Sequence, residues 1–183
     1  MNENTSKSLR VASTHFLIEP CTRCPVAGYL VVTSRLSVRS LSQLKPDALS
    51  SLGPTLAVAT RAIELVIRPD RVYCALFSEE TRSVHFHLFP RSQWVLSQYM
   101  DAYGADEHIS GPQLLDWARR TFRSPIPDDY EQKMQAIFRE IRAQHLGAAA
   151  NSESIRQRAA ISSGLDTSTA TMMGSRLLPL QFL

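Results

Sequence analysis

With 183 residues, 44% of them hydrophobic, the chain is long enough for one globular domain with a hydrophobic core and some appended segments. Its formal net charge of +3 does not by itself indicate a nucleic-acid-binding protein, although it suits a small anionic ligand. A polar N-terminus, no apolar run of membrane-spanning length and an odd count of 3 cysteines favour a soluble, cytoplasmic protein without a membrane partner.

Two strands are predicted near the N-terminus, after a polar tail over residues 1–10. The first strand covers residues 11–19 and is ended by Pro20, and the second covers residues 28–35. Both stretches are short, carry β-branched residues and lie between turn-like sequences, which is typical of strands.

A long helix is predicted next. It begins at Pro46, because proline is tolerated in a first helical turn, and it stops at residues 68–70. Residues 53–54, a glycine followed by a proline, predict a kink or a later start. Apolar residues recur at steps of three and four, which predicts a buried face made of Leu49, Leu52, Leu56, Ala59, Ile63 and Val66.

A hairpin is predicted after the helix. Its strands cover residues 71–78 and 84–90, and residues 79–82 form the turn between them. The order strand, strand, helix, strand, strand indicates an α+β domain with a mainly antiparallel sheet and a long helix across one face. Cys74, in the middle of the third strand, is expected to lie in the core.

The domain is predicted to cover residues 11–94 and to be followed by a helical extension over residues 95–147. Three helices are expected from about Ser92 onward, over residues 92–103, 110–122 and 127–146. Residues 148–183 are poor in aromatic residues and rich in small polar ones, so this tail is expected to be disordered. A basic cluster at the end of the second of these helices is interpreted as a solvated face: Arg119, Arg120 and Arg123.

The fourth predicted strand carries two histidines on one face. Side chains alternate along a strand, so the apolar residues of 84–88 point one way while Ser83, His85 and His87 point the other way. Imidazole groups there could bind a metal, or act as nucleophile and proton carrier near neutral pH. The alternative is a pair of partly buried histidines whose nitrogens bond to backbone carbonyls.

The stretch Ser-Val-His-Phe-His-Leu-Phe-Pro-Arg, residues 83–91, resembles the signature of the histidine triad family, His-x-His-x-His followed by apolar residues and often Pro-Arg. The sequence from Pro25 to Leu44 is similar to that family's glycine-led strand and its serine- and leucine-rich connector, and the helix and hairpin follow in the expected order. The resemblance covers about residues 11–122 and implies a HIT-like antiparallel sheet with a C-terminal helical extension.

The resemblance also implies chemistry at the α-phosphate of a nucleotide. His85 would be the nucleophile that forms a nucleotidyl-histidine intermediate, and His87, Ser83 and Arg91 would contact the nucleotide or its phosphates. The substrate would be a dinucleoside polyphosphate or a nucleoside phosphoramidate, cleaved by a hydrolase or used by a nucleotidyltransferase. The resemblance implies no metal and no cofactor, permits a homodimer, and gives no reason to expect a nucleic-acid partner.

Departures from the family pattern leave two alternatives open. Ser83 occupies the position of the first histidine, Tyr29 stands where a histidine often follows the glycine, and the usual glutamine is missing from residues 78–82. A nucleotide-binding protein with little or no turnover therefore stays an alternative. A zinc site that combines Cys21 and Cys24 with histidines is another, because their spacing suits zinc ligands.

Overall fold

The computed structural model describes residues 9–77, 83–104, 109–123 and 128–144. The chain divides into two units, Met1–His145 and Leu146–Leu183, and all described residues belong to the first. The predicted disordered tail and the predicted turn over residues 79–82 lie outside the described residues. None of the described helices is long and apolar enough to cross a membrane.

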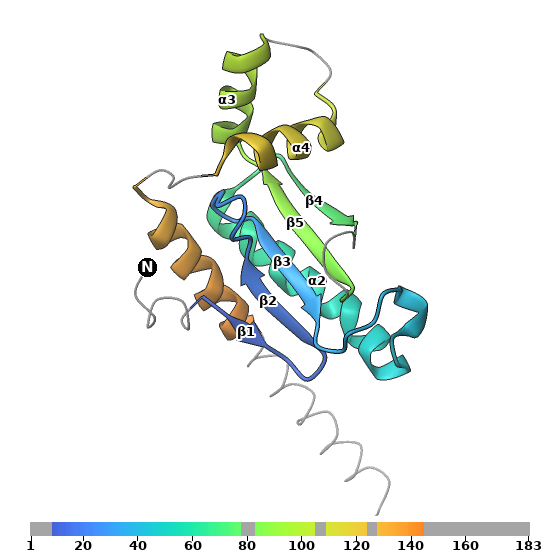
Figure 1. Cartoon of the computed structure of the whole chain (residues 1–183). Helices are drawn as coiled ribbons and strands as arrows, with labels where there is room; N and C mark the ends of the chain where they lie inside the picture. Colours follow the sequence, from blue (N-terminus) through green and yellow to red (C-terminus); the bar gives the residue numbers. More distant parts are fainter. Residues whose placement is uncertain (1–8, 78–82, 105–108, 124–127, 145–183) are drawn as a thin grey trace, which may run out of the picture. The chain divides into compact units, whose positions relative to one another are not determined.

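A five-stranded antiparallel sheet forms the centre of the first unit (Figure 1). The strands lie in the order β1-β2-β3-β5-β4, and each is antiparallel to its neighbours. Their bounds are β1 Val11–Ala12, β2 Phe16–Pro20, β3 Leu30–Ser34, β4 Arg71–Leu76 and β5 His85–Arg91. This sheet, with a long helix on one face, confirms the predicted α+β class.

The prediction of one strand over residues 11–19 is wrong, because the chain turns back on itself between β1 and β2. The backbone N–H of Ser13 donates to the carbonyl of Phe16 at 2.8 Å, and the Ser13 hydroxyl accepts from the Phe16 N–H at 3.0 Å. A serine side chain that bonds to nearby backbone in this way favours a turn over an extended strand.

Helix α2 (Pro46–Ile67) begins where predicted, after the short 3₁₀ helix η1 (Leu41–Gln43), and crosses one face of the sheet. It ends at Arg68, whose φ of 52° is left-handed and cannot continue the helix. A later start is wrong, because the helix continues through Pro54. Leu49 is also not in the buried face, since 45% of it is exposed. The buried side chains are mostly small ones, Ala48, Thr55, Ala59, Ala62 and Ile63.

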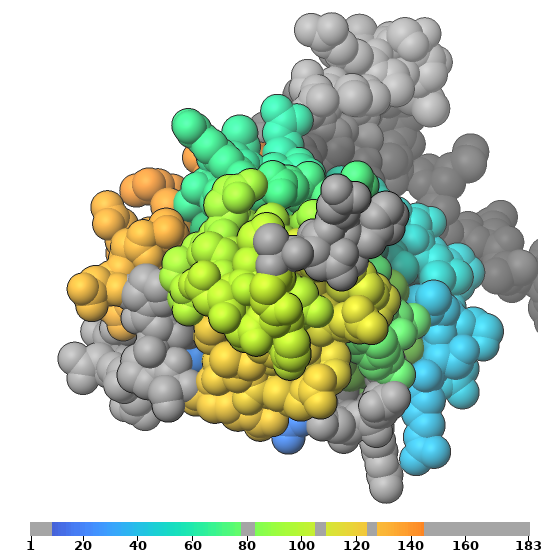
Figure 2. Space-filling model, turned by 90° about the horizontal axis from the view of Figure 1, so that it is seen from above, coloured from blue at the N-terminus to red at the C-terminus, as the bar shows by residue number. Residues whose placement is uncertain are grey.

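The remaining helices are α3 (Gln93–Tyr103), α4 (Gly111–Thr121) and a helix over residues 130–144. All three lie inside the predicted extension, apart from the first two residues of α3. Helices α3 and α4 lie against each other, as Figure 2 shows.

Two hydrophobic clusters lie on the two faces of the sheet. One combines α2 and the helix over 130–144 with residues such as Leu30 and Leu88. The other combines α3 and α4 with residues such as Tyr29 and Phe89. Leu88 and Phe89 are consecutive residues of β5, so their side chains point to opposite faces of the sheet. Helices α3 and α4, which pack with Phe89, therefore lie on the face opposite α2. In Figure 1 these two helices lie at one end of that face.

Candidate functional site

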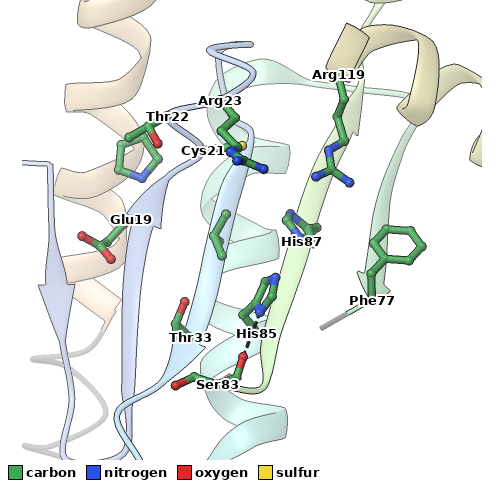
Figure 3. A pocket seen from close by; sticks show the side chains of 12 residues that line it. Glu19, Cys21, Thr22, Arg23, Thr33, Phe77, Ser83, His85, His87 and Arg119 are labelled. Atoms are coloured by element: carbon green, nitrogen blue, oxygen red, sulfur yellow. Dashed lines mark hydrogen bonds between the residues drawn. The ribbon is translucent and has the colours of Figure 1, made fainter. Parts of the chain in front are cut away.

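A cavity of about 670 Å³ lies on the sheet face opposite α2 (Figure 3). Strand β5 supplies His85 and His87, and Thr33 of β3 lies opposite His85 in the sheet register. Ser83 lies just before β5, and α4 supplies Arg119. The predicted alternation along the strand is therefore confirmed, because both imidazoles and Ser83 line the same cavity.

His85 is held with a defined protonation pattern. Its Nδ1 lies 2.9 Å from the backbone carbonyl oxygen of Ser83, two residues earlier. A carbonyl oxygen can only accept a hydrogen bond, so Nδ1 carries the proton when the ring is neutral. The other ring nitrogen, Nε2, is then unprotonated and has the lone pair that a nucleophile needs.

His87 lies next to His85, with ring centroids 4.9 Å apart, and is paired on its other side with Tyr29. Its Nδ1 is 3.0 Å from the Tyr29 hydroxyl. Burial, with smaller contributions from His85 and Arg119, lowers the pKa of His87 to about 4. Burial raises the pKa of Tyr29. Both side chains are therefore neutral at physiological pH.

Arg119 brings a positive charge to the cavity. It lies one helical turn after the buried Leu115, so the face of α4 that docks in the second cluster also carries Arg119 toward the strands. No carboxylate in the described part of the chain pairs with it. Glu19, the acidic residue of the cavity lining, is paired with Arg10 at 2.6 Å. The cavity is thus suited to an anion.

The interpretation of the basic cluster as a solvated face holds for Arg120 but not for Arg119. Arg120 is exposed and forms an ion pair with Asp116, whereas Arg119 is partly buried at the cavity. The helical periodicity of α4 was the available signal, because residue 119 shares a face with apolar residues and residue 120 shares a face with Asp116. The periodicity could not predict that this face of α4 reaches the cavity, because that depends on where α4 packs on the sheet.

Arg91 does not line this cavity, although it points to the same side of β5 as the histidines. It lies four residues beyond His87, about 13 Å along the strand, with the buried Phe89 between them. Its Nη1 lies 3.5 Å from the Tyr73 hydroxyl. The structure therefore separates Arg91 from the other predicted phosphate-contacting residues.

The three cysteines are free and do not assemble a metal site. Cys74 is exposed, so its predicted core position is wrong; it lies on β4, at an edge of the sheet. Cys24 is buried, its thiol donates to the Ala118 carbonyl at 3.4 Å, and burial raises its pKa to about 12. Metal ligation needs a thiolate, which this environment disfavours. Among the described residues, no group of three or more His, Cys, Asp or Glu side chains could hold a metal ion.

The lowered pKa of His87 predicts a loss of stability in mild acid. An imidazole in the unfolded chain takes up a proton below about pH 6.5, whereas folded His87 stays neutral down to about pH 4. The unfolded state therefore binds more protons than the folded state between pH 6.5 and pH 4. As the pH falls through this window, the free energy of unfolding decreases by about 3 kcal/mol. Urea unfolding at a series of pH values measures the effect.

A His87→Gln variant provides the comparison. Its free energy of unfolding should change less steeply between pH 6.5 and pH 4, because the variant lacks the imidazole of residue 87 and retains every other titrating group. Equal slopes for the two proteins would show that folded His87 takes up its proton as readily as an unfolded chain does.

No family model and no curated protein matches the sequence. Solved structures do match the fold. A histidine triad protein from Bradyrhizobium japonicum is 13% identical, with a TM-score of 0.52, and the match covers 77% of this chain and 96% of that one. A zinc-bound histidine triad family protein from Mycobacterium smegmatis is 14% identical, with a TM-score of 0.50, over 74% of this chain and 87% of that one. At these identities the likeness shows the fold, and it confirms the HIT-like fold that the sequence predicts.

Proposed function

We propose that this chain, which has the fold of the histidine triad proteins, is a nucleotide hydrolase or nucleotidyltransferase that acts at the α-phosphate. The observation that carries the proposal is the hydrogen bond from His85 Nδ1 to the Ser83 carbonyl, 2.9 Å long, inside a cavity suited to an anion. In the neutral ring this bond leaves Nε2 unprotonated beside the place where a phosphate would bind. Suitable substrates are dinucleoside polyphosphates and nucleoside phosphoramidates.

The proposed reaction has two displacement steps. In the first, the Nε2 lone pair attacks the α-phosphorus, an N–P bond forms, and the bond from phosphorus to the leaving group breaks with its electron pair. In the second, water or an acceptor phosphate attacks the same phosphorus, and the N–P bond breaks with its electrons returning to Nε2. When water is the nucleophile, its proton is released to the solvent. Between the steps the ring of His85 is cationic, so its Nδ1–H donates more strongly to the Ser83 carbonyl.

The neighbouring polar groups would stabilise the charge that develops on the phosphate. Arg119 contributes a guanidinium that can bind two phosphate oxygens at once, and His87 contributes a ring nitrogen from the same strand face. Ser83 would contribute its hydroxyl to the nucleotide or to the leaving group. A partly buried cation and oriented donors are more effective in such a cavity than they would be in water.

A second candidate function is nucleotide binding with little or no turnover. The observation that favours it is Ser83, because a hydroxyl at the start of the motif cannot carry the positive charge that a histidine could carry there. The cavity and its cation, Arg119, would still bind a nucleotide in this case.

Parallel binding and turnover measurements test the proposal. The protein is incubated with diadenosine tetraphosphate and with adenosine phosphoramidate, products are separated by chromatography, and binding is followed by calorimetry. We expect binding of at least one compound and protein-dependent release of adenosine monophosphate. Binding without product would favour the second candidate. The absence of both binding and product would exclude both candidate functions. If the natural protein binds a compound without cleaving it and a Ser83→His variant cleaves it, the missing turnover is due to Ser83.

A further inference from the structure

We propose that Tyr29 is a positioning residue that fixes His87 as the tautomer protonated at Nε2, so that a neutral imidazole presents an N–H group to the ligand. The catalytic consequence rests on the proposed function. The tautomer itself is a property of the ligand-free protein and can be measured without any substrate.

The contact between the two side chains allows only two hydrogen-bond arrangements. The Tyr29 hydroxyl and His87 Nδ1 are 3.0 Å apart and both side chains are buried, with 1% and 7% exposed. The pKa shifts of both residues keep the phenol protonated and the imidazole neutral. Either the phenol donates to an unprotonated Nδ1, or a protonated Nδ1 donates to the phenol oxygen.

The first arrangement satisfies the buried phenol and the second does not. If Nδ1–H were the donor, the phenol proton would need a different acceptor. The Cys21 thiol is the other hydrogen-bonding neighbour of this phenol, and sulfur is a weak acceptor. A buried hydroxyl without a good acceptor is costly, whereas donation to Nδ1 gives a strong bond to a ring nitrogen. The proton of neutral His87 is then on Nε2.

The backbone around Tyr29 holds its ring in place. Gly28 has a left-handed φ of 86°, and a Cβ there would lie 2.8 Å from Cγ1 of Ile67, so this position requires glycine. The Tyr29 N–H donates to the Val26 carbonyl at 2.9 Å, and its ring packs edge-on against Phe89 with centroids 5.1 Å apart. The hydroxyl is therefore fixed relative to β5.

The two histidines of the cavity thus have complementary patterns. In its neutral form His85 has its proton on Nδ1 and an unprotonated Nε2, because a carbonyl accepts from Nδ1. His87 has its proton on Nε2, because a hydroxyl donates to Nδ1. One ring provides a lone pair and the other provides a donor for a phosphate oxygen, and neither needs to be charged. Tyrosine, unlike histidine, cannot reverse this pattern by taking up a proton at physiological pH.

Nitrogen NMR of isotope-labelled, ligand-free protein at neutral pH tests the assignment directly. The ring signals of His87 are identified by their loss in His87→Gln. We expect the natural protein to show a protonated Nε2 and an unprotonated Nδ1. In Tyr29→Phe, which removes the hydroxyl and keeps the ring, the His87 nitrogens should move toward the averaged values of exchanging tautomers. Tyr73→Phe makes the same chemical change at a hydroxyl that contacts Arg91 instead, and should leave them unchanged.

Turnover gives the second readout. Tyr29→Phe should lower kcat by about tenfold, the equivalent of one lost hydrogen bond, and Tyr73→Phe should not lower it. A protonated Nδ1 in the natural protein would overturn the inference, and so would identical His87 signals in the natural protein and Tyr29→Phe. The first of these results needs only the His87→Gln variant for signal assignment, so a Tyr29→Phe chain that failed to fold would not prevent the test. An inactive protein with a protonated Nε2 would refute the proposed function and support this inference.

Discussion

Replacing His85 by alanine is expected to lower the rate of nucleotide turnover by about 10⁴-fold or more, while the affinity for the nucleotide changes much less. The reason is that the variant removes the atom that would form the N–P bond in the proposed reaction. His87 and Arg119, the cavity residues that the proposal assigns to anion binding, are retained. Single-turnover kinetics and equilibrium binding on the same preparations separate the two effects.

The intermediate itself provides a sharper observation. Intact-protein mass spectrometry after a brief incubation and an alkaline quench should show one added nucleotidyl group on the natural protein and none on His85→Ala. His15→Ala is the matched control, because His15 lies in the turn between β1 and β2 and does not line the cavity. It should keep both turnover and the mass increase. A His85→Ala protein that is folded and turns over at the natural rate would disprove the assignment of the nucleophile.

Replacing Arg119 by glutamine is expected to weaken nucleotide binding by about tenfold to a hundredfold. A charge-assisted hydrogen bond to a phosphate is worth about 1.5–3 kcal/mol, and Arg119 has no competing carboxylate partner among the described residues. Binding should also become less sensitive to salt, because one cation has been removed from the site. Calorimetry at two ionic strengths measures both changes.

Arg120→Gln is the control for this variant. Arg120 is the next residue on α4, is exposed and is paired with Asp116, so its loss should change the affinity by no more than about twofold. The pKa of His87 gives an independent readout, since Arg119 helps to lower it and Arg119→Gln should raise it. Equal affinities for the two variants would mean that the phosphate binds elsewhere in the cavity.

The residues that local sequence could place are those governed by strand and helix periodicity. His85 and His87 were assigned to one face because successive strand residues alternate, and the start and end of α2 followed from Pro46 and residues 68–70. The split between β1 and β2 was missed because it depends on hydrogen bonds of Ser13 that an extended strand would not make. Leu49 fitted the helical spacing and is nevertheless exposed, because smaller residues face the sheet.

The composition of the cavity could not be predicted in full, because it depends on tertiary packing. Arg91 points to the predicted face of the sheet, but it lies four residues beyond His87 on β5 and does not line the cavity. Arg119, some thirty residues later, reaches the cavity instead because α4 docks on the second cluster. Tyr29 was noted only as a departure from a family pattern, and its contact with His87 required the register of β3 and β5. Local patterns gave no measure of these long-range distances.

The origin of Arg119 in α4 divides the cavity between two structural layers. The sheet holds His85, the proposed nucleophile, and a helix outside the sheet holds Arg119, the proposed phosphate-binding cation. If the proposed function is correct, substitutions along that helix would change selectivity, for instance toward longer or less highly charged phosphate chains, without altering the strand pairing that positions His85.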